Sequence, residues 1–362
     1  MSDNLRRYRA IRQSLTQLCP TAQGNFARHL NTLAGLISGI VRSKRTNLPH
    51  IASHVPDGTH PDSRTKRFSR WINNSDVDAE VYFLPFAESL LRSLASRPLA
   101  LIMDGSTVGR GCLTLMVSVV YQRRALPIAW LVVRGRKGHF PEDTHIALLE
   151  QVRPLIPAGA QVVFLGDGEF DGVNLQDTID GYGWCYVNRT AKNIVLCSAG
   201  EEFSFESVAV QAGELISLPH VILRNQNYGP VHAIAWWEQG YDEPIYLLSN
   251  IADLAEACQW YRKRARIETF FSDQKSRGFH LHKSHLSDPT RLSRVMIAAC
   301  LAYIWIIHLG VLAWREEWRK VIHRTTRCDL SLFQLGLRLL EHFLNEGFEI
   351  PVAFQVSEWI DV

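Results

Sequence analysis

The sequence has 362 residues, of which 46% are hydrophobic and 21% charged, which excludes a disordered or fibrous chain and predicts two or three globular domains. Residues 1–75 contain 12 Lys/Arg and 3 Asp/Glu, a net charge of +9, whereas the remaining residues contain 27 and 33, a net charge of −6. A basic segment on a mildly acidic body indicates an anionic partner, with nucleic acid as the first candidate and a solvated basic face as the alternative.

The cysteines indicate a reducing compartment. There are seven, at wide spacings and without a C-x-x-C pair, which favours free thiols in the cytoplasm over a disulfide framework or a zinc finger. The first 15 residues lack the apolar run of a secretory signal. The cysteines are Cys19, Cys112, Cys185, Cys197, Cys258, Cys300 and Cys328.

The basic amino-terminal region, residues 1–95, is predicted to be helical. Residues 26–42 carry apolar side chains at helical spacing, and a short helix is expected from His50 to Val55. Residues 64–71, RTKRFSRW, combine four basic and two aromatic side chains. We interpret the region as a helical DNA-binding module, because basic helices of this kind contact phosphates and enter grooves. Its phosphate-contact candidates are Lys66, Arg67 and Arg70.

From about residue 98 the pattern changes to short apolar runs typical of buried strands. The predicted order is β-β-β-α-β-α-β, an α/β arrangement. The first run ends at Asp104 and the fourth at Asp167. The predicted strands are LALIM, CLTLMVSVVYQ, ALPIAWLVVRG, QVVFLG and GWCYVNRT, with helices at 143–154 and 171–180.

Residues 191–250 are expected to form an antiparallel insertion. Four alternating runs, FESVAVQ, ELISLPHVILRN, HAIAWWEQ and PIYLLSNI, are separated by turn residues, and the last is a candidate to return to the main sheet. Helices are then predicted at 253–276, 288–314 and 330–346.

Residues 295–314 are 20 mostly apolar residues, long enough to cross a bilayer. The run contains His308 and Gly310 and is followed at once by Arg315 and two glutamates. We predict a buried helix packed on a sheet, with a membrane span as the alternative.

The segment 261–275, YRKRARIETFFSDQK, is predicted to form part of one continuous helix. On it Tyr261, Arg264, Glu268 and Lys275 fall within a sector of about 60°, beside an apolar stripe. Taken alone, the stripe favours a salt-bridged surface helix, because Arg264 and Glu268 form an i, i+4 pair.

The two strand-end aspartates make a catalytic interpretation possible. If the first and fourth strands are neighbours, Asp104 and Asp167 meet, and Glu268 can join them. Converging carboxylates require a counter-charge, which divalent cations supply, and two Mg²⁺ ions can clamp a phosphodiester. Glu169 and Asp171 are alternatives to Asp167, which is preferred because it directly follows its strand.

These motifs resemble those of DDE transposases of the bacterial insertion-sequence-four group. The group's Y-x2-R-x3-E-x6-K pattern is complete at Tyr261, Arg264, Glu268 and Lys275, and the two aspartates stand in MDGST and GDGEF. The resemblance extends over residues 20–310 and includes the insertion and the basic amino-terminal segment. The region after residue 330 is shorter than in the group, which leaves the group's carboxyl-terminal elements in doubt here.

The resemblance implies an RNase H-like mixed sheet flanked by helices, with a β-rich insertion and a helical amino-terminal DNA-binding domain. The implied units are residues 1–95, 96–190, 191–243, 244–325 and 326–362.

The resemblance also implies a cut-and-paste reaction on double-stranded DNA. Element ends, which are terminal inverted repeats, are hydrolysed, form a hairpin, reopen and join target DNA, by a homodimer in the bacterial cytoplasm. Asp104, Asp167 and Glu268 would hold two Mg²⁺ ions, for which Mn²⁺ can substitute, and Tyr261, Arg264 and Lys275 would contact phosphates. A nuclease without strand transfer and an inactive DNA-binding derivative remain alternatives.

For several further residues the sequence leaves two alternative roles open. Arg189, after the fifth strand, is a weaker phosphate candidate, and Trp236 and Trp237 are either base-stacking residues or ordinary strand aromatics. The loop with Arg134, Arg136 and Lys137 either touches DNA or is a solvated turn. The spacing of His280, His282 and His285 favours a basic DNA-facing loop over a metal site.

Overall fold

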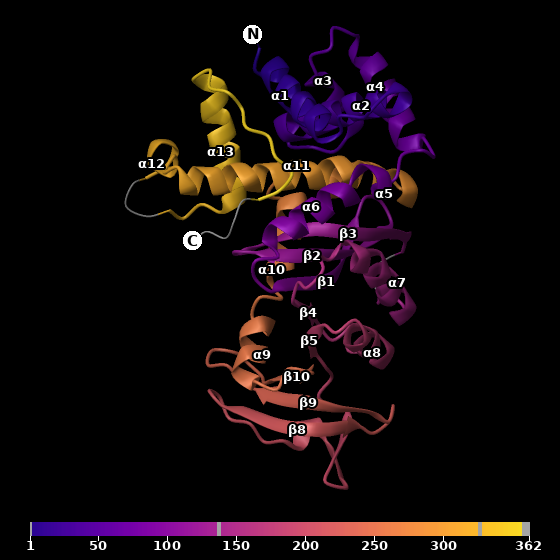
Figure 1. Cartoon of the computed structure of the whole chain (residues 1–362), viewed down its shortest axis with the longest axis vertical. Helices are drawn as coiled ribbons and strands as arrows, with labels where there is room; N and C mark the ends of the chain where they lie inside the picture. The colour runs from indigo at the N-terminus through magenta and orange to yellow at the C-terminus, as the bar shows by residue number, and fades with distance from the viewer. Residues whose placement is uncertain (1, 136–138, 325–327, 357–362) are drawn as a thin grey trace.

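The computed structural model describes residues 2–135, 139–324 and 328–356 (Figure 1). Helices α1 to α6 precede the sheet, as the sequence predicted for this region. In α2 every residue from Thr32 to Val41 is buried, because neighbouring helices surround it. At Gly39 a Cβ would lie 2.7 Å from the carbonyl oxygen of Ile51, so glycine permits this close helix crossing. The helices are α1 (Asp3–Leu18), α2 (Gly24–Ser43), α3 (Leu48–Ser53), α4 (Pro61–Asn73), α5 (Ala79–Tyr82) and α6 (Leu84–Leu94).

One mixed sheet runs through the rest of the molecule in the order β3-β2-β1-β4-β5-β10-β9-β8-β6-β7. β1 is antiparallel to β2 and parallel to β4, and β4 is parallel to β5, which is the predicted RNase H-like arrangement. The strands are β1 (Leu99–Val108), β2 (Cys112–Tyr121), β3 (Arg124–Arg134), β4 (Val162–Gly166), β5 (Cys185–Arg189), β6 (Val195–Ser198), β7 (Glu201–Ser204), β8 (Leu215–Leu223), β9 (Tyr228–Trp236) and β10 (Ile245–Ser249).

The register of β1 and β4 places the two aspartates side by side. Ile102 pairs with Leu165, so Asp104 and Asp167, each two residues further on, share one face. The predicted neighbourhood of the first and fourth strands is therefore confirmed. Asp104 itself does not end its strand as predicted, because β1 continues to Val108 in its hairpin with β2, beyond the end of β4.

Helices cover both sides of the first five strands. In Figure 1, α9 and α10 lie to the left of these strands and α7 and α8 to the right. Their bounds are α7 (Glu142–Val152), α8 (Val173–Gly181), α9 (Leu254–Tyr261) and α10 (Arg266–Gln274), with short 3₁₀ turns η1 (Arg153–Leu155), η2 (Phe205–Ser207) and η3 (Leu281–Lys283).

The insertion extends the main sheet and has an apolar cluster of its own around Leu196, Phe205 and Val221. β10 pairs with β5, so the expected return to the main sheet is confirmed. The predicted strand FESVAVQ is wrong, since Phe205–Ser207 form η2 and the rest is irregular. The β6–β7 hairpin was not predicted, because its four-residue strands are too short and polar to show a period.

The predicted continuous helix 253–276 is wrong. α9 ends at Tyr261 and α10 begins at Arg266, and the link between them is held by i→i−3 hydrogen bonds, such as Arg264 N to Tyr261 O at 2.9 Å. Lys275 follows the last residue of α10. Every residue of the link is compatible with a helix, so the break reflects tertiary contacts that override propensity.

Helix α11 (Pro289–Arg315) is long and apolar enough to cross a membrane, but 89% of its apolar window is buried within the protein. It packs against β3, α2 and α13 (Leu332–Asn345), which agrees with the predicted buried helix. Close packing on α13 depends on Gly310, where a Cβ would lie 2.0 Å from the carbonyl oxygen of Leu332. The short helix α12 (Arg319–Ile322) lies between α11 and α13.

Candidate active site

Two carboxylates form the centre of the site. Asp104 projects from β1 and Asp167 directly follows β4. Backbone amides fix their orientation, because Gly105 N donates to Asp104 Oδ1 at 2.7 Å and Glu169 N donates to Asp167 Oδ1 at 3.0 Å. The side chains are 17% and 31% exposed, so both are partly withdrawn from water but accessible from one side.

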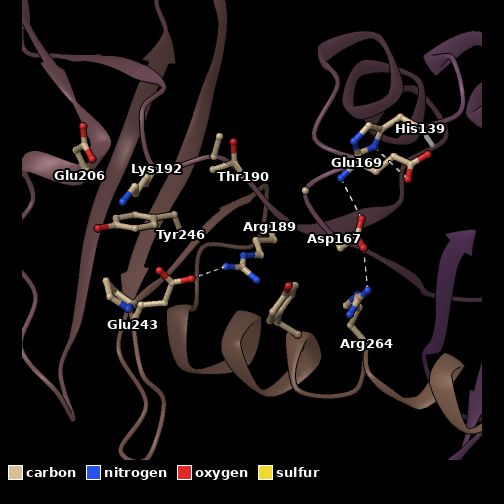
Figure 2. Close-up of a pocket in the computed structure, with 14 residues that line it drawn as sticks. His139, Asp167, Glu169, Arg189, Thr190, Lys192, Glu206, Glu243, Tyr246 and Arg264 are labelled. Carbon is tan, nitrogen blue, oxygen red and sulfur yellow. Dashed lines mark hydrogen bonds and ion pairs between the residues drawn. The ribbon is translucent and has the colours of Figure 1, made fainter. Parts of the chain in front are cut away.

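The guanidinium of Arg264 lies among three carboxylates. Its Nη2 donates to Asp167 Oδ2 at 2.9 Å, as Figure 2 shows, and lies 3.5 Å from Asp104 Oδ2. Its Nη1 lies 3.6 Å from Glu268 Oε1. The turn between α9 and α10 carries Arg264, whereas Glu268 is in the first turn of α10 and is 67% exposed. The predicted acidic triad is thus brought together, around a cation of the chain itself.

Burial raises the pKa of Asp104 to about 6, against the opposing effect of Arg264, and the neighbouring Asp167 raises it further. A carboxyl with a raised pKa is less stable in its ionised form than it would be in water. Arg264 therefore offsets only part of the cost of ionising Asp104 in this buried position.

The other residues of the Y-R-E-K pattern lie at the margins of the triad. Lys275 Nζ donates to Ser106 Oγ at 2.6 Å, two residues beyond Asp104 on β1. Burial lowers the pKa of Lys275, and Asp104 partly offsets that effect. Tyr261 is 9% exposed, and burial raises the pKa of its hydroxyl. Sequence reasoning did not identify Ser106, although it lies in the MDGST motif.

A cavity of about 850 Å³ opens beside Asp167 and extends along the end of β5 toward the insertion (Figure 2). Arg189 Nη2 lies 3.5 Å from Glu243 Oε1 across it. Cationic and acidic side chains alternate along its length, so it suits a ligand with spaced charges more than an apolar one. Its lining is His139, Asp167, Gly168, Glu169, Arg189, Thr190, Ala191, Lys192, Glu206, Glu243, Pro244, Tyr246, Tyr261 and Arg264.

The alternative acids are engaged elsewhere. Glu169 accepts from Phe140 N at 2.6 Å and lies 3.3 Å from His139 and 3.5 Å from His145. Asp171 accepts from Thr190 Oγ1 at 2.7 Å. The geometry therefore favours Asp167 at the triad. The histidines around Glu169 were not predicted, since they reach it from a separate segment.

The candidate stacking residues lie outside the residues that line the cavity. Trp236 is 5% exposed, and the guanidinium of Arg262 lies 4.8 Å from its ring centroid. Trp237 is half-buried, and its Nε1 donates to Tyr241 O at 2.8 Å. Trp236 is covered in this conformation, so Trp237 is the more available of the two.

The basic candidates are dispersed. On α4, Lys66 and Arg70 are exposed, whereas Arg67 pairs with Asp57 at 2.6 Å. Arg134 is exposed at the end of β3, and Arg136 and Lys137 lie outside the described residues.

The histidines of the HLHKSH segment do not gather. The His280 and His282 rings lie 5.8 Å apart, and His285 Nδ1 accepts from Arg110 Nη2 at 3.0 Å. Within the described ranges, no three His, Cys, Asp or Glu side chains are placed so that they could hold a metal ion as they stand. At the acidic triad, Arg264 lies where the three carboxylates approach one another.

Comparison with known proteins finds a family match for the part of the chain that contains the sheet and the acidic triad. A family model described as "Transposase DDE domain" matches residues 96–305. A search of curated proteins found no match. Among solved structures, the chain is similar to the cryo-EM structure of a piggyBac transposase synaptic complex with hairpin DNA, with 11% identity and a TM-score of 0.45, covering 96% of this chain and 80% of that one.

Because burial disfavours the ionised form of Asp104, removing its charge should stabilise the folded protein. The raised pKa means that the folded protein loses stability as pH rises from about 4 to above 6, when Asp104 ionises. Near pH 8 in EDTA, Asp104→Asn should therefore have a free energy of unfolding about 1–3 kcal/mol above that of wild type, and a higher melting temperature. This gain should shrink near pH 4. Thermal melts check this, with Asp242→Asn, on an exposed turn, as the control. A gain that does not depend on pH would contradict it.

Proposed function

Because the chain belongs to the transposase DDE domain family, we propose that it is a cut-and-paste DNA transposase, which hydrolyses phosphodiesters at the ends of a mobile element and joins the freed 3′ ends to target DNA. One observation carries the proposal: Asp104, Asp167 and Glu268, from β1, the end of β4 and α10, all lie within 3.6 Å of one guanidinium. Three carboxylates that converge on one guanidinium create a local negative charge that favours the binding of cations.

The donors fit divalent metal ions. All three are carboxylates, the hard oxygen ligands that Mg²⁺ prefers and Mn²⁺ accepts, and Arg264 now balances the negative charge that such ions would balance. When bound, two ions would polarise the phosphate and activate the attacking water or 3′ hydroxyl. Asp104, Asp167 and Glu268 would hold them.

Arg264 and Lys275 would then bind phosphate. Once the carboxylates are neutralised by metal, the guanidinium of Arg264 is free to form two parallel hydrogen bonds to phosphate oxygens. Lys275, beside Ser106, supplies a point charge on the β1 side of the triad. Tyr261 shares the cavity wall with Arg264 and positions the strand at the cleaved bond.

The cavity would hold the strand beyond the cleaved bond. Arg189 and Lys192 on its wall are suited to phosphates, and Arg189 must first release Glu243. In the hairpin step of the proposed reaction, a base turned out of the duplex stacks on Trp237. Two element ends have to be joined in one event, so we expect a homodimer on DNA, acting in the cytoplasm at the nucleoid.

Removing any triad acid should abolish cleavage. Asp104→Ala, Asp167→Ala and Glu268→Ala should each lower Mg²⁺-dependent cleavage by about 10³-fold, because the charge that stabilises the transition state is lost. The substrate is DNA carrying the element's own ends, found as inverted repeats bounded by a direct duplication around the gene. Binding to the same DNA should remain near wild type.

Glu150→Ala is the matched control, since Glu150 is an exposed acid on α7 that does not line the cavity. Full cleavage by any triad variant would remove that residue from the proposed site. Cleavage by the wild type without joining to target DNA would support a nuclease instead.

Arg264 provides a test of metal binding that is independent of activity. In the absence of DNA, Arg264→Ala should bind Mn²⁺ at least about tenfold more tightly than wild type, about 1.4 kcal/mol, because the competing positive charge is gone. Electron paramagnetic resonance of free Mn²⁺ measures this directly. Adding Asp104→Asn should reverse the gain.

Arg262→Ala serves as the control, since Arg262 lies in the same turn but pairs with Glu238 at 2.7 Å. Equal Mn²⁺ affinity in the two arginine variants would show that Arg264 does not compete with the metal.

A further inference from the structure

A second cavity, of about 430 Å³, lies between α2 and α4 in the amino-terminal helices, which Figure 1 shows at the end of the molecule opposite β8. Its lining includes three arginines and three asparagines and no carboxylate. We call it the α2–α4 groove. It is lined by Tyr8, Asn25, Arg28, His29, Asn31, Thr32, Arg67, Arg70, Trp71 and Asn74.

The fold makes the groove from two polar ladders. On α2 the first turns present Asn25, Arg28 and Asn31 at helical spacing, before the continuously buried part begins at Thr32. On α4 the buried Phe68 and Ile72 anchor the helix, and Arg67 and Arg70, with Asn74 just after the helix, line the groove from the other side.

Hydrogen bonds hold the floor of the groove in place. The Asn74 side-chain nitrogen Nδ2 can only donate, so at 3.2 Å it donates to His29 Nε2, and His29 Nδ1 then donates to the Tyr82 hydroxyl at 2.7 Å. Trp71 packs edge-on against Tyr82 with ring centroids 6.0 Å apart. The walls are therefore positioned before any ligand arrives, which lowers the entropy lost on binding.

The charge of the groove is only partly neutralised. Arg67 pairs with Asp57, which is not among the lining residues. Arg28 Nη1 donates to Asn25 Oδ1 at 3.4 Å, a weak neutral contact. Among the residues that the structure describes, no carboxylate lies within ion-pair distance of Arg28 or Arg70. Two guanidinium groups on facing walls thus remain free for an anion, with amide donors between them.

We propose that the α2–α4 groove binds the sugar–phosphate backbone of one DNA strand, with Arg28 and Arg70 contacting phosphates from opposite walls and Asn25 and Asn31 donating to phosphate oxygens. The inference rests on the proposed function, since it takes DNA as the substrate. It adds α2 to the interface that the sequence placed on α4 alone, and it leaves Lys66 outside the groove.

The shape favours backbone over bases. A segment that reads base edges must project into a major groove about 12 Å wide, whereas these side chains line a concavity of about 430 Å³. The concavity is too small for a duplex and large enough for a short piece of one backbone. Contacts of this kind fix register and carry no direct sequence information.

The test is the salt dependence of binding to two duplexes of unrelated sequence, measured by fluorescence anisotropy over a series of KCl concentrations. The slope of log binding constant against log KCl concentration is negative, and each lost phosphate contact should reduce its magnitude by about 0.9. Arg28→Ala combined with Arg70→Ala should therefore reduce it by about 1.8, equally on both duplexes. Arg28→Lys, which keeps the charge, should retain most of the slope.

Arg92→Ala is the control. Arg92 on α6 is 68% exposed and pairs with Glu88, so this variant removes one positive charge at a site outside the groove. If the double variant has the slope of Arg92→Ala, the inference is overturned. A loss confined to one duplex would indicate base reading and would also overturn it. If the wild-type protein binds neither these duplexes nor DNA that carries the element's own ends, the proposed function itself fails.

Discussion

The convergence of Asp104, Asp167 and Glu268 on Arg264 is the constraint on which the rest of the catalytic half depends. Three carboxylates at this separation repel one another, and partial burial of Asp104 strengthens the repulsion. Arg264 offsets part of it from the link between α9 and α10, where the backbone hydrogen bonds are of the i→i−3 type. The break between the two helices and the ion pairs therefore meet at the same residue.

That arrangement needs a rigid frame. The parallel pairing of β1 and β4 fixes the two aspartates in register, and the fully buried β2 holds β1 along the part that extends beyond β4. Behind the sheet, the buried length of α11 joins the strands to α2 and α13. A core of this size compensates for charged groups placed at its margin, which are individually unfavourable.

Much of this could be predicted from the sequence, because apolar runs and their spacing report burial. The β1–β4 neighbourhood followed from the order of strands and helices, and it made Asp104 and Asp167 a pair. The break before Arg266 could not be predicted, because every residue of the link is compatible with a helix and Arg264 meets Asp167, 97 residues away, only in the folded chain. The α2–α4 groove was also hidden, because Asn25 and Arg28 acquire meaning only when α4 faces them.

The two sets of arginines differ in a way that bears on the order of events. Arg264 is neutralised by the protein's own acids, so it adds little to the attraction of free DNA, whereas Arg28 and Arg70 have no such partners among the described residues. In the proposed mechanism, DNA affinity therefore comes first from the amino-terminal helices, where no carboxylate lines the groove. In the same mechanism, Arg264 would become available to phosphate only after metal neutralises the triad. Binding and cleavage would then depend on different cations, and a DNA molecule held by the helices alone would not be cut.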